Sequence, residues 1–391
     1  MKDIWQETTE KILNKKKLSI AIIVAIIVVV LISVSIIYVV NTSVRGWIDK
    51  NIFRKEVKQD RATTIELKEE QSNIYAFNKY IGILNKNQFD IYNSSGNKED
   101  SLEIQVSNPL FDSANRFLAI AESKGQKIYM ISDKTVTWEN SIEGEISQVH
   151  INKNGYVAVV IINTSYKTVI QMYNPEGKEL FKTYLKTTRT VDATISNDNK
   201  YLAIAEVDTS GSVIKSNIKV ISIDKASSDP TNSLETTFES ENDNLITNIK
   251  YQNKNKLVCM YTDSIHVIEN GKDETIVDKK NKKMIIQSID LSDNIIYVEE
   301  QSSGLFTANS SVNIVNVDSK SIKKYTANSI AKEMYLADDI IALNLGTEIE
   351  FINKGGWLVK RYVANQEITN IVVSNSMAGI IYRDKIEIVN F

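Results

Sequence analysis

The chain has 391 residues, of which 42% are hydrophobic and 24% charged, with a net charge of -3. This balance is typical of a folded protein, and the near-neutral charge gives no argument for nucleic-acid binding. The single cysteine, Cys259, excludes an intramolecular disulfide, and we interpret it as a packed small hydrophobe.

The N-terminal region predicts a membrane anchor. Residues 1–17 are too few for a folded domain and are interpreted as a short cytoplasmic tail. Residues 18–40 carry no charge, and at about 1.5 Å per residue such a helix crosses a hydrocarbon core of about 30 Å. The lysines at 15–17 favour a cytoplasmic N-terminus. A cleaved signal peptide is the rival, but no Ala-x-Ala-like site follows, so we expect an uncleaved signal anchor in the cell membrane.

Residues 41–61 form a basic linker in which Trp47 and Phe53 stand among charged residues. A juxtamembrane helix lying on anionic lipid has this composition. A stalk that continues the membrane helix has it too, and both interpretations stay open.

Residues 62–391 repeat one pair of short strands, seen most clearly at 117–132. The first strand of the pair is almost wholly apolar, which indicates that both of its faces are covered. Its third residue is usually small, as at Gly82 and Ala119, which we interpret as close approach of blade to blade near an axis. Eight copies of the first strand can be aligned, beginning near Tyr80, Phe117, Tyr156, Tyr201, Lys256, Ile295, Ile340 and Met377.

The spacing of the copies, with no helical pattern between them, predicts an all-β fold, a β-propeller of eight four-stranded blades or alternatively seven. A solenoid or two β-sandwiches are the rival architectures. We expect the repeated pair to be the inner hairpin of each blade. The last copy stops at Phe391, one strand short, and residues 62–70 form an unpartnered strand. This strand is expected to complete the last blade and close the ring.

Two segments, DSANRFLAIA from Asp112 and SNDNKYLAIA from Ser196, resemble the turn-and-strand signature of WD40-like and TolB-like propeller repeats. The proline and glycine usual in that turn are missing, as is the Trp-Asp dipeptide. One membrane helix followed by a propeller is similar to uncharacterised membrane-anchored propellers of low-GC Gram-positive bacteria. The resemblance implies an architecture and transfers no active-site residue.

No catalytic or cofactor motif is recognisable, which favours a protein that is not an enzyme and has no cofactor. The two histidines, His150 and His266, are interpreted as strand residues and with one cysteine make no zinc set. No metal site is predicted. Carboxylates recur at one aligned position of the repeat, namely at Glu122, Glu206 and Glu300. They are interpreted either as solvated residues at the rim of the propeller or, if they face the channel, as residues that can bind a cation or act in acid–base chemistry.

The long connections between strands of the repeat give a better indication of function. Residues 208–216 and 301–311 join equivalent strands and should open on one face, whereas residues 225–233 should form a flexible crossing on the opposite face. Within residues 301–311, Leu305 and Phe306 stand among polar residues. They are interpreted either as contacts for a protein partner or as residues packed on a neighbouring blade.

Two functions are therefore expected. The first is a surface-facing propeller that serves as a protein-interaction scaffold in the cell envelope, with a protein partner and no nucleic acid. The rival is a receptor or enzyme that acts on envelope glycans or peptides through the central channel. Fold alone does not choose between the two, since propellers serve both functions. The rival predicts that tyrosine, tryptophan and carboxylate side chains converge at one mouth of the channel.

Overall fold

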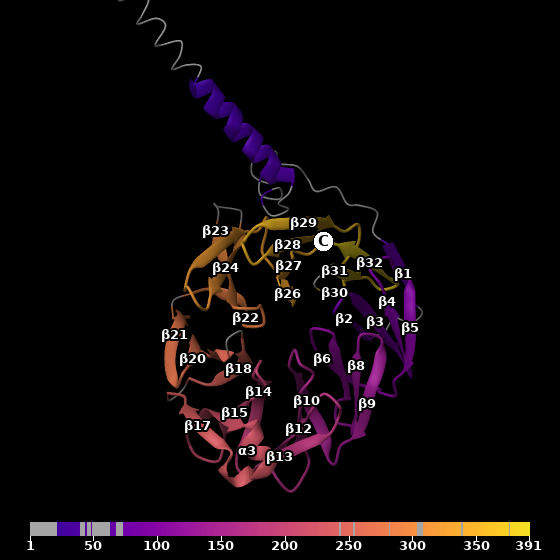
Figure 1. Ribbon diagram of the computed structural model, residues 1–391, viewed down its shortest axis with the longest axis vertical. Coiled ribbons are helices and arrows are strands. Elements are labelled where there is room, and N and C mark those ends of the chain that lie inside the picture. The colour runs from indigo at the N-terminus through magenta and orange to yellow at the C-terminus, as the bar shows by residue number, and fades with distance from the viewer. Residues whose placement is uncertain are drawn as a thin grey trace, which may run out of the picture.

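The computed structural model of the protein describes residues 22–39, 44, 48, 63–67, 73–241, 244–252, 255–280, 282–302, 308–337, 339–374 and 376–391. Within these residues the strands form eight antiparallel sheets of four strands each. The sheets are arranged as blades around a central axis, as Figure 1 shows, so the predicted β-propeller with eight blades is confirmed. Ahead of the blades lies one apolar helix, Ile22–Val39.

The blades follow one another along the chain. Blade 1 contains β2 (Asn73–Phe77), β3 (Tyr80–Asn85), β4 (Gln88–Tyr92) and β5 (Lys98–Glu103). Blade 2 contains β6 (Pro109–Ala114), β7 (Phe117–Glu122), β8 (Lys127–Ser132) and β9 (Thr135–Ser141). Blade 3 contains β10 (Glu145–Ile151), β11 (Val157–Ile162), β12 (Thr168–Tyr173) and β13 (Glu179–Leu185). Blade 4 contains β14 (Arg189–Ile195), β15 (Tyr201–Asp208), β16 (Lys215–Ser222) and β17 (Leu234–Glu239).

The second half of the ring repeats this order. Blade 5 contains β18 (Ile246–Tyr251), β19 (Leu257–Tyr261), β20 (Ser264–Glu269) and β21 (Lys272–Asp278). Blade 6 contains β22 (Met284–Ser288), β23 (Asn294–Ser302), β24 (Ala308–Asn316) and β25 (Ile322–Thr326). Blade 7 contains β26 (Glu333–Ala337), β27 (Ile340–Asn344), β28 (Glu348–Asn353) and β29 (Leu358–Val363). Blade 8 contains β30 (Asn370–Val373), β31 (Met377–Ile381), β32 (Lys385–Asn390) and β1 (Thr63–Glu66).

The repeated strand pair occupies the two middle strands of each blade, not the inner hairpin that the sequence predicted. A more variable first strand lies on the axis side of the pair, and most consecutive first strands contact each other around the ring (Figure 1). The middle strands read as apolar because neighbouring blades cover both of their faces. The small third residue does mark a close approach between blades, since a Cβ at Gly379 would lie 2.9 Å from Ile81 of blade 1.

The ring closes through β1, as expected. This strand pairs antiparallel with β32, and Ile65 lies opposite Ile386. Eight apolar clusters fill the spaces between successive blades, and the cluster across the closure joins Ile65 and Ile81 to Met377 and Ile388. Each buried side chain of this size contributes about 2 kcal/mol relative to exposure, so closure completes the core as well as the last sheet.

The tight turns use asparagine and aspartate in place of glycine. Of the eleven described residues with positive φ that are not glycine, six are Asn and two are Asp, as at Asn115 and Asn199. These side chains tolerate the left-handed conformation and bond to their own backbone, which explains how a chain with 14 glycines makes so many turns.

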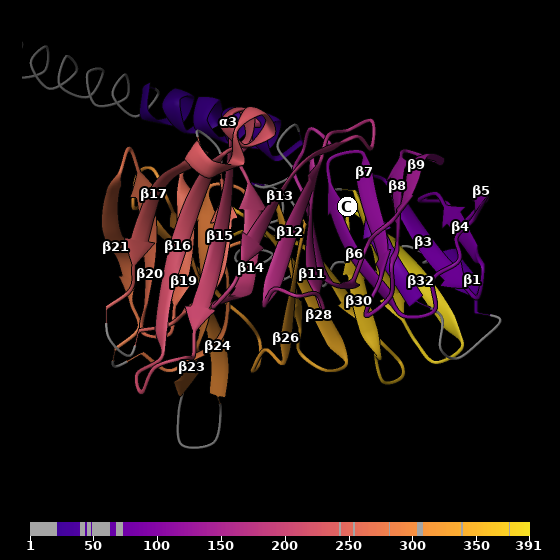
Figure 2. The same cartoon turned by 90° about the horizontal axis from the view of Figure 1, so that it is seen from below.

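The two faces of the disc differ. The hairpin face carries the turns between second and third strands, and the α3 face carries α3 (Ile223–Ser228) and the short 3-10 helix η1 (Pro230–Asn232) (Figure 2). Residues 225–233 were expected to be a flexible crossing, and this was wrong in part. The Ser222 hydroxyl caps α3 by accepting from the Lys225 N–H at 3.4 Å, and Ile223 and Ala226 are buried.

Candidate functional site: the axial channel

One position on the first strands makes a ring around the axis. In every blade this residue is paired with the third residue of the aligned repeat, counted from the eight starting positions found in the sequence, so the eight positions are equivalent in register. The side chains are nevertheless chemically different, and most are polar: Tyr75, Asp112, His150, Thr194, Lys250, Gln287, Tyr335 and Val372.

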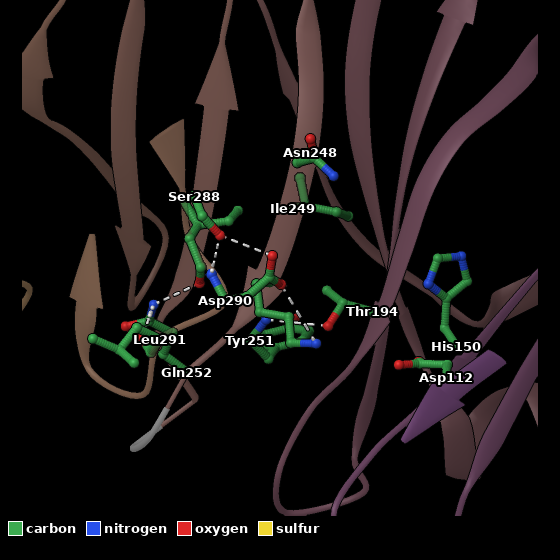
Figure 3. A network of polar contacts seen from close by, with 12 residues as sticks. Asp112, His150, Thr194, Asn248, Ile249, Tyr251, Gln252, Ser288, Asp290 and Leu291 are labelled. Atoms are coloured by element: carbon green, nitrogen blue, oxygen red, sulfur yellow. Dashed lines mark hydrogen bonds and ion pairs between the residues drawn. The ribbon is translucent and has the colours of Figure 1, made fainter. Parts of the chain in front are cut away.

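The polar ring residues on one side of the channel tie neighbouring blades together. The Asp112 Oδ2 atom accepts the Ile151 N–H at 2.8 Å, and the equivalent Thr194 hydroxyl accepts the Tyr251 N–H at 3.1 Å (Figure 3). Both receiving N–H groups belong to the next blade. The first function of these side chains is therefore structural, because they satisfy backbone donors that face the channel.

A second carboxylate, Asp192 on β14, is held by three donors. It accepts from the backbone N–H groups of Ala193 and Ile249 at 2.9 and 2.8 Å and from the Asn248 amide at 3.3 Å. Burial raises the pKa of Asp192 to about 6 in spite of these hydrogen bonds.

His150 lies beside this carboxylate, with its Nδ1 atom 3.6 Å from the Asp192 Oδ1 atom. Burial lowers the pKa of His150 to about 4, so the imidazole is neutral at pH 7 and the contact is not an ion pair. Its Nε2 atom lies 3.1 Å from the Gln148 side-chain oxygen. His150 is therefore a strand residue, as the sequence analysis expected, and its ring contacts a side-chain amide of the same strand.

A cavity of about 560 Å³ occupies the channel and reaches the α3 face. It is lined by first strands of six blades and by the turns that follow β2 and β6. Its charged residues are Asp112, Lys250 and Asp290, and its aromatic residues include Tyr75 and Tyr335. This volume lies within the range of about 300–1,000 Å³ that is usual for small-molecule sites.

Lys250 is the cation of the cavity. Its Nζ atom lies 3.9 Å from the Asp290 Oδ1 atom, and its side chain remains 40% exposed. Burial lowers the pKa of Lys250, but the carboxylates of Asp290, Asp112 and Asp192 outweigh this effect and the net pKa is raised. The Ser288 hydroxyl donates to the other oxygen of Asp290 at 2.9 Å.

The three aligned glutamates lie in three different blades and outside the residues that line this cavity. Glu300 is exposed, and Glu122 is half-buried with its Oε1 atom 3.5 Å from the Ser107 N–H. Glu206 is only 1% exposed and forms an ion pair with Lys219 at 2.6 Å. One aligned position thus holds two solvated carboxylates and one buried ion pair.

Leu305 and Phe306 lie outside the described residues. The strands on either side are longer than expected, since β23 continues to Ser302 and β24 begins at Ala308, with Gln301 paired to Asn309. Cys259 is fully buried, as expected, and burial raises the pKa of its thiol. Within the residues that the structure describes, no group of three or more His, Cys, Asp or Glu side chains is placed to hold a metal ion.

The sequence analysis missed the channel ring because it aligned the chain on the middle strands. A signal was available, since six of the eight ring residues pair with the recurrent small residue, Gly or Ala, of the next strand. Counting backwards across the turn from Gly82 or Ala119 leads to Tyr75 or Asp112.

Fold and channel together define the protein as an eight-bladed β-propeller with a polar axial cavity. Residues 53–391 match the model of a family described as "Family of unknown function (DUF5711)", and the chain belongs to this family. No curated protein matches the chain.

Several solved propellers are similar in fold. The C-terminal WD40 domain of Sif2 gives a TM-score of 0.57 at 11% identity, covering 86% of this chain and 99% of that chain. Sqt1 of Chaetomium thermophilum, solved bound to the N-terminus of ribosomal protein L10, gives 0.52 at 9% identity, covering 85% and 100%. BamB from Moraxella catarrhalis gives 0.50 at 11% identity, covering 85% and 99%. At such identities the similarity shows the fold alone.

Proposed function

We propose that the protein is anchored in the cell membrane by one helix and presents its propeller outside the cell as a scaffold for protein partners in the envelope. The helix Ile22–Val39 supports the anchor, because it is apolar and long enough to span a membrane and its side chains are exposed. In this proposal residues 1–17 stay in the cytoplasm, residues 18–40 span the membrane and residues 41–61 lead to the propeller at 62–391.

Strand directions indicate which face points away from the anchor. Glu66 pairs with Lys385, which follows a turn on the hairpin face, so β1 begins at Thr63 on the α3 face. A chain that arrives from the membrane therefore reaches the disc at its α3 face. The opposite, hairpin face is then free for partners, and Figure 2 shows the ends of β23 and β24 projecting on that side.

The observation that carries the scaffold proposal is the apolar surface of the hairpin face. Val213 and Ile214 project from the β15–β16 turn with 46% and 47% exposure, and Tyr184 is 51% exposed at the end of β13. The adjacent pair Val213 and Ile214 is an exposed apolar contact of the kind that binds a protein partner. Ile285, Ile330 and Val363 lie at strand ends or turns of the same face. Leu305 and Phe306 lie outside the described residues, and in this proposal they remain candidate contacts for the partner.

The test is crosslinking and affinity capture of the full-length protein from intact cells. Val213 and Ile214 are replaced by serine together, and a second variant shortens residues 303–307. A matched control replaces Leu234 and Ile322 by serine, since these are 53% and 52% exposed at the α3 face. A defined protein that is lost with the hairpin-face variants and kept in the control supports the proposal. Capture of the same proteins by all variants contradicts it.

A second candidate function is a receptor, or an enzyme, that takes a glycan or peptide into the axial channel. It is favoured by the tyrosine and carboxylate side chains that line one mouth of the channel. The three glutamates remain candidate ligand residues only in this version, and their separation into three blades argues against a shared site.

A further inference from the structure

The charged side chains of the axial cavity can form further hydrogen bonds, both as donors and as acceptors. The Lys250 ammonium has three N–H donors, and its distance of 3.9 Å from Asp290 is longer than a hydrogen bond. Asp112 uses one carboxylate oxygen to accept the Ile151 N–H. Its other oxygen makes no hydrogen bond to the residues that the structure describes, so it can accept from a ligand.

Asp290 completes the arrangement on the Lys250 side. Its Oδ2 atom accepts from Ser288, and its Oδ1 atom is the one that faces Lys250. Figure 3 shows Asp290 and Ser288 on one side of the view and Asp112 on the other. The cavity therefore presents one cation flanked by two carboxylates.

This distribution of charge selects the class of ligand. A simple anion would approach Lys250 but would also meet Asp112 and Asp290, and a simple cation would be repelled by Lys250. A molecule with both an ammonium and a carboxylate group can pair with each sign at once. Charge-assisted hydrogen bonds of this kind are about twice as strong as hydrogen bonds between neutral groups.

The walls leave room for a small ligand held in a fixed orientation. Tyr75 is stacked on Phe111 with ring centroids 4.9 Å apart, and the Tyr335 hydroxyl donates to Glu333 at 2.8 Å, so both rings are held in place. Met334, Leu336 and Val372 add apolar surface to the cavity.

We infer that the axial cavity binds a small zwitterion, a free amino acid or a short peptide, with the ligand carboxylate on Lys250 and the ligand ammonium on Asp112 and Asp290. The ligand enters from the α3 face, because the turns after β2 and β6 that line the cavity lie there. This inference refines the second candidate function and is independent of the scaffold role, which uses the opposite face.

The test is calorimetric titration of the full-length protein in detergent with three related dipeptides. Alanyl-alanine carries both charges, its N-acetyl derivative lacks the ammonium, and its C-terminal amide lacks the carboxylate. We expect alanyl-alanine to bind and each blocked derivative to bind at least tenfold more weakly. Binding by none of the three, or equal binding by all, contradicts the inference.

Variants distinguish binding of the dipeptide in this cavity from binding elsewhere on the protein. Lys250→Met should abolish the preference for a free carboxylate, and Asp112→Asn should reduce the preference for a free ammonium. Matched controls are Lys178→Met and Asp224→Asn, which change exposed residues outside the cavity. Thermal unfolding verifies that each variant is folded. If the controls weaken binding as much as Lys250→Met does, the dipeptide binds elsewhere and the inference is wrong, whereas the partner-capture result is unaffected.

Discussion

Glu206, Glu122 and Glu300 show how one aligned sequence position acquires different properties. Only Glu206 is buried, and its charge is compensated by Lys219 at 2.6 Å and by the hydroxyl of Thr188, which donates to the other oxygen. A buried carboxylate without such partners is strongly destabilising. The sequence showed that the position recurs, but burial depends on residues of other strands and could not be predicted from the recurrence.

The Glu206–Lys219 pair gives a prediction for stability. Lys219→Met should lower the free energy of unfolding by roughly 2 to 3 kcal/mol, because it leaves Glu206 buried without its cation, while the 30% exposure of Lys219 moderates the loss. Adding Glu206→Gln to this variant should restore part of the stability. Glu300→Gln is the matched control and should change stability by less than about 0.5 kcal/mol. Denaturant titration measures all three, and equal effects at Glu300 and Lys219 would contradict the assignment.

His150 predicts a dependence of stability on pH. Its pKa of about 4 in the folded protein is below the ordinary 6.5, so the unfolded chain takes up the proton first as pH falls. This contribution to stability is present above pH 6.5 and is lost progressively toward pH 4. Asp192 acts in the opposite sense, because its raised pKa of about 6 makes its contribution fall as pH rises through 6.

Replacing His150 by glutamine isolates the first effect. The stability lost between pH 6.5 and 4 should be smaller in His150→Gln than in the wild type by up to about 3 kcal/mol. Proton NMR of the His150 ring gives an independent check, with a midpoint near 4 expected. A midpoint near 6.5 would show that the ring is not desolvated.

At the scale of elements, the strand β1 closes the ring. Ile65 is 5% exposed and packs between β32 and blade 1, whereas Thr64 on the same strand is exposed. The sequence predicted this strand because an apolar–polar segment stood unpartnered before the first repeat while the last repeat lacked a strand. Closure follows from the need to pair a free sheet edge.

The closure can be tested by one substitution in β1. Ile65→Ala should destabilise the protein by about 2 to 4 kcal/mol, since it removes a buried side chain from the cluster that joins the first and last blades. Thr64→Ala is the control and should be nearly neutral. Thermal or denaturant unfolding is the measurement. An Ile65→Ala protein as stable as the control would mean that β1 contributes little to the ring.

Other elements were harder to predict. The sequence predicted the start of the middle strands almost to the residue, because both of their faces are apolar. The first strands vary in sequence, because their side chains line the channel and differ from blade to blade. Residues 225–233 were expected to form a flexible crossing, but helix α3 begins just before them, and its capping residue and two buried side chains hold it against blades 3 and 4.

At the scale of the whole molecule, the repeat determines the architecture and the departures from the repeat determine the candidate sites. Fold class, blade number and closure could be predicted because they depend on patterns that recur eight times. The channel ring was missed, because its side chains differ from blade to blade and only the small residue with which most of them pair marks their position. The hairpin face is similar: its exposed residues come from blades 3, 4, 6 and 7.

The central proposal is a propeller held outside the membrane with its hairpin face outward. The most direct test uses a membrane-impermeant maleimide on intact cells that express Val213→Cys. The wild type is the background control, because its only cysteine, Cys259, is fully buried and should not react. We expect Val213→Cys to be labelled in intact cells at the level reached after permeabilisation. Labelling only after permeabilisation would place the propeller inside the cell and contradict the account.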